Sequence, residues 1–126
     1  MSSNSFSKNE RLCNKDKIDL IFSDGVKISD YPIKLKWIEL KSQDNCLQTL
    51  ISVPKRRIPK ASDRNSIKRL IRESFRLNKQ HLIDQLTKKN ISISLAIIYS
   101  HNKVLTYKQI HDKICLTLRR LSQRYD

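Results

Sequence analysis

Apolar residues follow one another at helical spacing near the start of the chain. Ile18, Ile21 and Phe22 stand at i, i+3 and i+4, which is the pattern of one face of an amphipathic helix. Asn14 is a residue type that caps helix starts, and Gly25 is the type that most often ends them. The pattern therefore predicts a short helix between Asn14 and Gly25.

The next two apolar segments have the pattern of strands. Residues of Tyr31–Leu40 alternate between apolar and polar, which is the period of a strand with one buried face. The apolar face holds Ile33, Leu35 and Trp37, and the basic face holds Lys34 and Lys36. Leu47–Val53 is a second apolar run, joined to the first by the polar segment Lys41–Asn45. We expect these two strands to pair as antiparallel neighbours.

From Ala61 to about Lys79 the spacing becomes helical again. The narrow apolar face consists of Ile67, Leu70, Ile71, Ser74 and Phe75. This spacing predicts a long amphipathic helix, and a second helical stretch, or a continuation of the first, extends to about Lys88. The helix follows Pro54, which ends the preceding strand, and a basic loop at Lys55–Lys60.

The end of the chain predicts one more strand and one more helix. Ile91–Tyr99 is dense in β-branched residues, which favours a strand. Thr106 can cap the last helix. The apolar residues of that helix recur every three or four positions at Ile110, Ile114, Leu118 and Leu121. The order is helix, two or three strands, helix, strand, helix, which favours a mixed sheet with helices packed on it.

The length and composition fit one folded domain. The chain has 126 residues, of which 38% are apolar, so we expect a single domain over residues 9–126. Residues 1–8 are polar and rich in serine, and we expect them to form a disordered N-terminal end. No apolar run reaches the length of a membrane span, and the first residues lack a signal-peptide core. These features predict a cytoplasmic protein without a membrane partner.

Cysteine and histidine residues are few and scattered. The three cysteines are Cys13, Cys46 and Cys115, and the three histidines are His81, His101 and His111. They form no CxxC or HxH pair, which argues against a disulfide framework and a zinc site. No pair of carboxylates stands at a spacing that could hold two metal ions for phosphodiester cleavage. We therefore expect neither a catalytic residue nor a metal ligand in the protein.

A large excess of positive charge is the strongest functional signal in the composition. Lys and Arg number 26 against 12 Asp and Glu, which gives a formal net charge of +14. Self-repulsion of this size is relieved by a polyanion, and nucleic acid is the first candidate. Between Pro54 and Lys79 ten residues are basic and only two are acidic. The charge is therefore concentrated on the basic loop and the long helix.

The basic residues of the long helix lie in a row. Four of them are four positions apart and so share one side of the helix: Arg64, Lys68, Arg72 and Arg76. Like charges at this spacing destabilise an isolated helix by a few tenths of a kcal/mol per pair, so the row calls for an anion. A solvated basic face is the alternative, but few acidic residues stand nearby to form ion pairs. Arginine forks onto phosphate oxygens and Asn65 can read a base edge or a ribose hydroxyl, which favours structured RNA.

The segment Arg64-Asn-Ser-Ile-Lys-Arg-Leu-Ile-Arg-Glu-Ser-Phe-Arg76 resembles the signature of the protein subunit of bacterial ribonuclease P. The usual form of that signature is Arg-Asn-Arg-x-Lys-Arg-x-x-Arg-Glu-x-Phe-Arg. The resemblance continues at Ser52-Val-Pro-Lys-Arg56, Ala61, Glu10-Arg-Leu12, Ile18–Gly25 and Leu105-Thr-Tyr107. It covers nearly the whole chain, from about Phe6 to Leu121.

The resemblance implies an α+β fold. It implies a two-layer α/β sandwich of order αβββαβα, with a mixed sheet and a left-handed βαβ crossover. This fold is similar to the second domain of a small-subunit ribosomal protein. The resemblance also implies that the RNA subunit, not the protein, hydrolyses the phosphodiester bond that frees the mature 5′ end of tRNA. Magnesium ions are then expected in the holoenzyme, held mainly by RNA.

The resemblance assigns two groups of residues. Those expected to bind the catalytic RNA are Arg64, Asn65, Lys68, Arg69, Arg72 and Arg76, with Lys55 and Arg56 in the loop before them. From the resemblance, Ile18 and Phe22 are expected to line a cleft for the single-stranded 5′ leader of precursor tRNA. Strand alternation alone, and not the resemblance, adds Lys34 and Lys36, with Lys55, to the same groove. Stacking of bases on an aromatic ring in a cationic groove tolerates many sequences, as one enzyme acting on many tRNAs requires.

Two residues depart from the family pattern. Ser66 stands where a third basic residue is usual, and Ile18 stands where phenylalanine is frequent in the leader cleft. Phe22 retains an aromatic ring for the leader cleft, although an ordinary core position under the sheet would explain a phenylalanine there equally well.

Two other functions compete with this one. The first rival is a structural ribosomal or other RNA-binding protein, which would share the basic helix but process no substrate. The second rival is a DNA-binding regulator with Ala61–Lys79 as its recognition helix. The strands predicted on both sides of that helix disfavour the regulator, because a helix-turn-helix needs helices there. We therefore expect the RNA subunit and precursor tRNA, and not DNA, as partners.

Overall fold

The computed structural model describes residues 15–40 and 46–125. Its helices are α1 (Lys15–Asp24), α2 (Ala61–Asn78), α3 (Gln80–Lys89) and α4 (Tyr107–Gln123). Its strands are β1 (Val26–Asp30), β2 (Ile33–Leu40), β3 (Leu47–Ser52) and β4 (Ser92–Tyr99). The expected cap Asn14, the N-terminal end at residues 1–8 and the segment Lys41–Asn45 lie outside the described residues.

The four strands form one mixed sheet in the order β1-β2-β4-β3. β4 pairs antiparallel with β2 and parallel with β3. The expected pairing of the strands at 31–40 and 47–53 as direct neighbours is therefore wrong, because β4 lies between them. The physical reason is burial. Nearly every side chain of β4 is buried, and a strand that is buried on both faces belongs in the middle of a covered sheet.

β1 is the third strand that the apolar pattern left open. It pairs antiparallel with β2, with Ile28 opposite Leu35. The two strands are joined by a tight turn at Tyr31 and Pro32. β1 is short and has one buried side chain, Ile28, which explains why its alternation is hard to recognise in the sequence.

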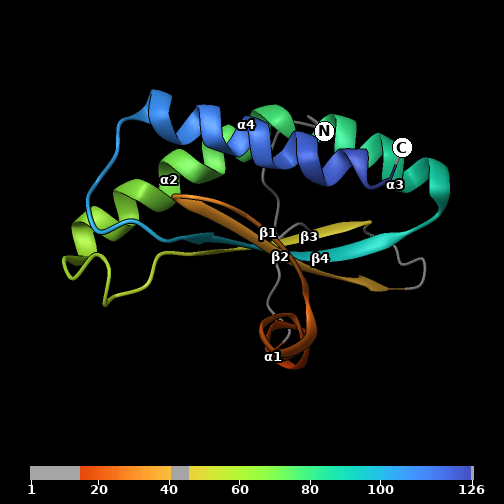
Figure 1. Ribbon diagram of the computed structural model, residues 1–126, viewed down its shortest axis with the longest axis horizontal. Coiled ribbons are helices and arrows are strands. Elements are labelled where there is room, and N and C mark those ends of the chain that lie inside the picture. Colours follow the sequence, from red (N-terminus) through yellow and green to blue (C-terminus); the bar gives the residue numbers. More distant parts are fainter. Residues whose placement is uncertain (1–14, 41–45, 126) are drawn as a thin grey trace.

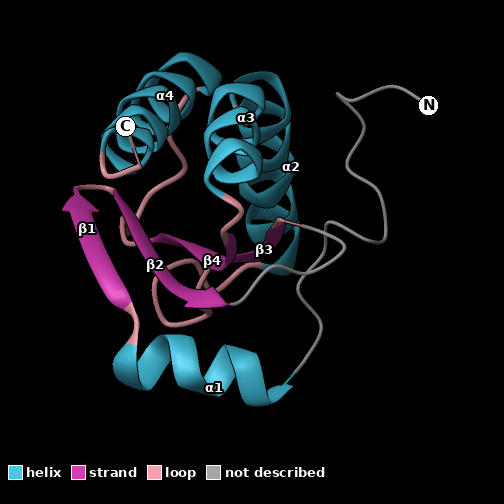
Figure 2. Ribbon diagram, turned by 90° about the vertical axis from the view of Figure 1, so that its right-hand side faces the viewer, coloured by secondary structure: helices cyan, strands magenta, loops and turns pink. Residues whose placement is uncertain are grey.

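Helices cover both faces of the sheet (Figures 1 and 2). α2, α3 and α4 lie over one face, and α1 lies against the other. The larger core lies under the three helices and includes Leu35 and Trp37 of β2. The smaller core lies under α1 and consists of Ile21, Ile38 and Ala96. Within the described residues, no helix is both long enough and apolar enough to cross a membrane.

The helical segment between β3 and β4 is two helices. Lys79 separates α2 from α3, so the expected order αβββαβα holds with its second helix divided. α3 ends at Asn90, whose φ of 57° is in the left-handed region that asparagine tolerates better than most residues. Thr106 caps α4 as predicted, because its side chain accepts from Gln109 N while the Gln109 side chain accepts from Thr106 N.

Gly25 brings α1 close to the sheet. Its N–H donates to Ile21 O at 2.9 Å, which closes the last turn of α1. A Cβ atom at this position would stand 2.4 Å from Ile21 O and 3.2 Å from Trp37 O. Gly25 does not have a positive φ, so glycine is required here by the close approach of two backbones and not by a left-handed turn.

Gly25→Ala is expected to lower the free energy of unfolding by about 1–3 kcal/mol, the usual cost of forcing an extra methyl group into a packed place. Chemical denaturation followed by circular dichroism measures this change. Val26→Ala, at the next and exposed position, is the control and should change the same quantity by less than about 0.5 kcal/mol. Equal stability of Gly25→Ala and the unaltered protein would contradict the close approach.

Candidate RNA-binding surface

α2 turns its apolar side toward the core and its basic side outward. Its fully buried apolar residues are Ile67, Ile71 and Phe75. Residues four apart drift by about 40° around a helix of 3.6 residues per turn, so the row from Arg64 to Arg76 moves away from the buried side. Arg64 and Lys68 are half-buried, whereas Asn65, Arg69 and Arg72 are exposed. We call these five residues, with Arg76, the basic helix face.

Arg64 holds the basic loop against the start of α2. Its Nη1 donates to Ile58 O at 3.0 Å and to Pro59 O at 2.7 Å. Lys60, at the N-cap position, makes no side-chain capping hydrogen bond. The side-chain bonds from Arg64, with the backbone bond from Arg64 N to Lys60 O at 3.1 Å, join the loop to the first turn. Arg64 therefore has a structural role in addition to the RNA contact that the family motif implies.

Arg76, at the other end of the row, pairs with an acidic residue of its own helix. Its Nη2 lies 2.5 Å from Glu73 Oε1, and its Nε donates to Glu73 Oε2 at 3.1 Å. The hydrogen bond from Arg76 lowers the pKa of the Glu73 carboxyl, and the same bond raises the pKa of Arg76. Glu73 thus offsets part of the positive charge at this end of the basic helix face.

The loop before α2 is anchored at one apolar residue and displays two cations. Arg57 N and Ile58 N both donate to Pro54 O, at 3.0 and 3.1 Å, which forms a tight turn. Ile58 is buried in the larger core, whereas Lys55 and Arg56 are exposed. The two predicted RNA-binding residues of the loop are therefore held on a fixed turn beside the basic helix face.

Lys34 and Lys36 lie on the α1 side of the sheet, as their alternation in the sequence predicted. They share a face of β2 with Ile38, which packs against α1 in the smaller core. In the register of the sheet, Lys34 is opposite Ile98 and Lys36 is opposite Ala96. Both lysines are half-buried, so their stems line the sheet while their charged ends reach toward solvent.

Phe22 is displayed at the surface. Its side chain is 42% exposed, while the neighbouring Ile21 is fully buried, so the alternative of an ordinary core residue is wrong. Lys36 Nζ lies 5.6 Å from the centroid of the Phe22 ring, within the range of a cation–π contact. Ile18 packs at the edge of the smaller core. We call Ile18, Phe22, Lys34 and Lys36 the α1 surface.

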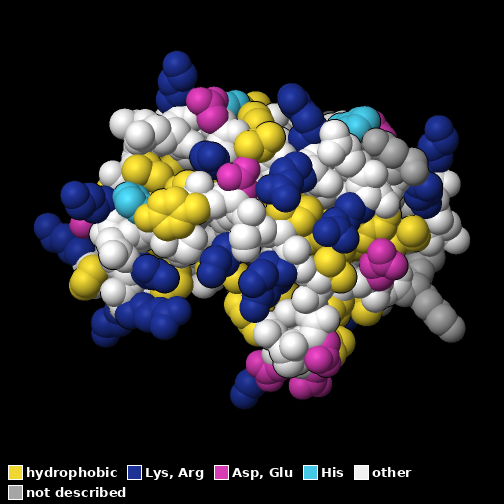
Figure 3. Space-filling view, in the orientation of Figure 1, with side chains coloured by type: hydrophobic (Ala, Val, Ile, Leu, Met, Phe, Trp, Pro, Cys, Tyr) yellow, Lys and Arg dark blue, Asp and Glu magenta, His cyan; other side chains and the backbone are white. Residues whose placement is uncertain are grey.

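The two predicted groups are not one patch, and the basic loop joins them. Lys34, Ile98 and Ser52 lie side by side on the three neighbouring strands β2, β4 and β3. Ser52 is the last residue of β3, so the basic loop with Lys55 begins just after it. Figure 3 shows a hollow beside α1, at the bottom of the view, with Lys and Arg side chains gathered around it. A single RNA-binding surface can therefore run from α1 across the sheet to α2.

Arg57 makes a contact across the fold that the sequence did not single out from the basic loop. Its Nη1 donates to Asn102 Oδ1 at 3.2 Å, which joins the basic loop to the segment between β4 and α4. The two residues are far apart in the chain and no local pattern links them. Only the folded arrangement could have identified this contact.

The described residues do not gather a metal site. Among them, no group of three His, Cys, Asp or Glu side chains is placed to hold a metal ion. Cys46 and Cys115 are free thiols, and burial raises the pKa of Cys115, which disfavours the thiolate that metals bind. The described residues therefore offer no cluster of side chains that could hold a resident magnesium ion.

The model of the family described as Ribonuclease P matches residues 6–122 of the chain. This chain belongs to the ribonuclease P protein family. The ribonuclease P protein component of Porphyromonas gingivalis (strain ATCC 33277) is 31% identical over 118 residues, which are 92% of this chain and 85% of that protein. A second strain of the same organism, W83, gives the same identity and coverage.

Solved structures show the same fold. The ribonuclease P protein of Staphylococcus aureus is similar with a TM-score of 0.69 and 22% identity, over 89% of this chain and 94% of that one. The ribonuclease P protein of Thermotoga maritima is similar with a TM-score of 0.68 and 22% identity, over 88% of this chain and 96% of that one. The α+β fold implied by the sequence motif is confirmed.

Family membership decides the role of the chain. It is the protein component of ribonuclease P, an endonuclease of tRNA processing in which the RNA subunit carries out catalysis. Its partner is accordingly that RNA subunit. The rival readings as a ribosomal protein or as a DNA-binding regulator are thereby set aside.

Phe22→Ala is expected to change the free energy of unfolding by less than about 1 kcal/mol, because half-exposed side chains contribute little packing. Ile21→Ala, one residue earlier, should cost about 2–5 kcal/mol, as truncation of buried aliphatic side chains does. Urea denaturation of the two variants provides the comparison. A large loss of stability in Phe22→Ala would mean that Phe22 is a core residue.

Proposed function

We propose that the α1 surface of this chain binds the single-stranded 5′ leader of precursor tRNA while the basic helix face binds the RNA subunit. The observation that carries the proposal is the exposure of the Phe22 ring on α1. The ring lies next to Lys36, which is on the face of β2 that α1 covers. The protein would thereby hold the leader beside the catalytic RNA, which hydrolyses the phosphodiester bond and produces the mature tRNA 5′ end.

The composition of the α1 surface supports a single-stranded RNA ligand. An unpaired base can stack on the Phe22 ring, and Lys34 and Lys36 can neutralise the phosphates that follow it. Ile18 offers an apolar contact in place of a second ring. Because stacking and charge are indifferent to base identity, leaders of many sequences would bind.

The basic helix face has the donors that a folded RNA backbone accepts. Lys68, Arg69 and Arg72 present cationic groups along one side of α2, and Asn65 offers an amide beside them. Arginine can contact phosphate oxygens in a bidentate manner. Since the basic loop joins this face to the α1 surface, one protein can contact both RNAs at once.

Catalysis in this proposal belongs to the RNA, and the protein supplies position. When bound, magnesium ions held mainly by the RNA subunit would supply the activation of water and the neutralisation of charge that phosphodiester hydrolysis needs. The residues of this chain would raise the fraction of precursor tRNA whose leader is bound and would fix the path of that leader. This lowers the entropic cost of reaching the reactive geometry. Newly transcribed tRNA precursors are processed where they are made, so we expect the chain to act in the cytoplasm.

The purified protein is expected not to cleave precursor tRNA alone but to stimulate cleavage by its cognate RNA subunit at low magnesium concentration. Binding of the leader by the α1 surface is the physical reason, so the stimulation should fall as the leader is shortened. Single-turnover cleavage of substrates with graded leader lengths measures it. Stimulation that is equal for long and short leaders would contradict leader binding, and no stimulation at all would contradict the processing role.

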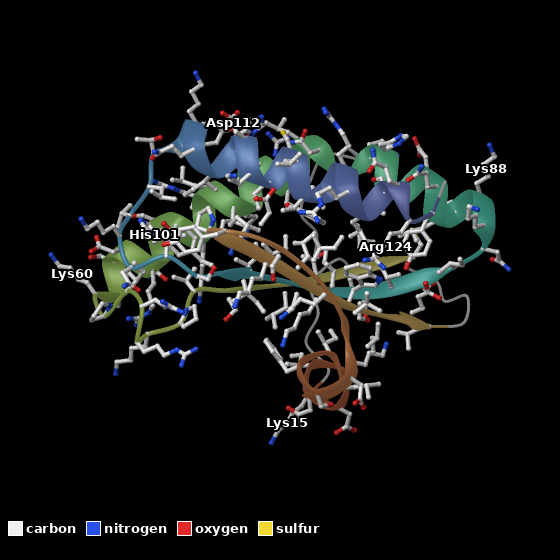
Figure 4. The ribbon with its side chains drawn as sticks, in the orientation of Figure 1. Lys15, Lys60, Lys88, His101, Asp112 and Arg124 are labelled. Carbon is white, nitrogen blue, oxygen red and sulfur yellow. The ribbon has the colours of Figure 1, made fainter. Side chains whose placement is uncertain are left out.

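Arg72→Ala is expected to weaken binding to the RNA subunit and to flatten the slope of log K against log salt by about one, because one phosphate contact releases about one counterion. Filter binding across a salt series measures the slope. Lys88→Ala is the matched control, since Lys88 is exposed at the opposite end of the molecule from α2's first turn (Figure 4), and its slope should be unchanged. An unchanged slope in Arg72→Ala would mean that Arg72 contacts no phosphate.

A further inference from the structure

Tyr31 is the most exposed large apolar side chain in the described part of the chain, at 62%. It lies in the turn between β1 and β2, at the end of the sheet. Packing in the core does not explain an aromatic residue at this position, because most of the surface of the ring is open to water. An aromatic ring held in this way needs another explanation, since exposed apolar surface of this kind is a frequent feature of binding sites.

His101 holds the Tyr31 ring in place. Tyr31 Oη and His101 Nδ1 are hydrogen-bonded, and the two rings meet edge to face, with centroids 5.4 Å apart and planes at 87°. His101 also packs edge to face on Tyr99, which is fully buried. The exposed ring is therefore connected to the core through a histidine and has little freedom to turn.

The backbone around Tyr31 is tied to the segment that follows β4. Ser100 N and Ser100 Oγ both donate to Pro32 O, at 2.8 and 2.9 Å. Tyr99 Oη donates to Lys103 O at 2.5 Å, which closes that segment on itself. The turn and the segment thus form one rigid support, and a stacking base would meet a preorganised ring.

The segment that holds Tyr31 is linked to a cation of the basic loop. Asn102, next to His101, accepts a hydrogen bond from Arg57 of the basic loop. Lys34 of the α1 surface follows three residues after Tyr31 on β2. Figure 4 shows His101 at the same end of the molecule as Lys60, where the basic loop meets α2. The ring therefore stands at the end of the sheet where the basic loop lies.

We propose that Tyr31, held by His101, is a stacking platform for one unpaired base of the 5′ leader, beyond the part of the leader that Phe22 contacts. The inference rests on the proposed function. A platform of this kind requires a base that is not already stacked in a helix, and the leader is single-stranded while the RNA subunit is folded. Arg57, linked to the same segment through Asn102, would supply positive charge for a phosphate beside the stacked base.

The test uses the holoenzyme reconstituted from this chain and its cognate RNA subunit. Dissociation constants are measured for precursor tRNA with a leader of about ten nucleotides, within the length that single-strand-binding folds cover, and with a leader of one nucleotide. Tyr31→Ala should weaken binding of the long-leader substrate by at least about fivefold, the lower end of what a base stacked on an aromatic ring contributes. Binding of the short-leader substrate should not change.

Further variants separate the ring from its support. Tyr31→Phe keeps the ring and loses the hydroxyl, so long-leader binding should remain within about twofold of the unaltered protein if stacking provides most of the contribution. His101→Ala removes the support and should give a partial loss. Tyr107→Ala is the matched control, because Tyr107 is also an exposed tyrosine that contacts a histidine, His111, but lies on α4. It should leave the ratio of long-leader to short-leader affinity unchanged.

The possible outcomes are distinct. Equal long-leader binding by Tyr31→Ala and the unaltered protein overturns the platform, while leader-dependent stimulation by the unaltered protein still supports the proposed function. Equal losses for long and short leaders, or weaker binding of the RNA subunit, also overturn it, because they place Tyr31 on another RNA segment. An unaltered protein that shows no leader dependence overturns the proposed function itself.

Discussion

Burial of β4 on both faces is the constraint on which the rest of the structure depends. Because nearly all of its side chains are buried, the sheet must be covered on both sides. α2, α3 and α4 cover one side, and α1 covers part of the other (Figure 2). α1 has only ten residues, and it leaves Lys34, Lys36 and Ile98 half-buried, with the ring of Phe22 near Lys36. The packing that completes the core thus also creates the proposed leader surface.

Some of the basic residues stabilise the fold, and the others are available to bind RNA. Arg64 donates to two carbonyl groups of the loop, and Arg57 donates to Asn102. Glu73 pairs with Arg76. Arginine can serve in such dual positions because its planar group carries five N–H donors. The loop is thereby fixed with Lys55 outward, and binding of an RNA backbone to the remaining cations offsets the repulsion that a net charge of +14 creates.

Local patterns in the sequence predicted much of the structure. The helix at 61–78 and the cap at Thr106 follow from spacing and residue type, which act within a few neighbouring positions. Alternation also placed Lys34 on the face opposite the larger core, and the motif of α2 led to the family. The strand neighbours were predicted wrongly, because pairing depends on which strand can be buried on both faces. Likewise, spacing alone could not decide whether Phe22 was core or surface.

What the sequence by itself determined is most of the elements, the charge on α2 and the family, since each depends on residues close together in the chain or on a motif within one helix. The tertiary structure alone decided that β4 enters the sheet between β2 and β3. It alone also brought Tyr31 against His101 and Arg57 against Asn102. These contacts join residues that are 70 and 45 positions apart, and such pairs meet only when the whole core has been packed.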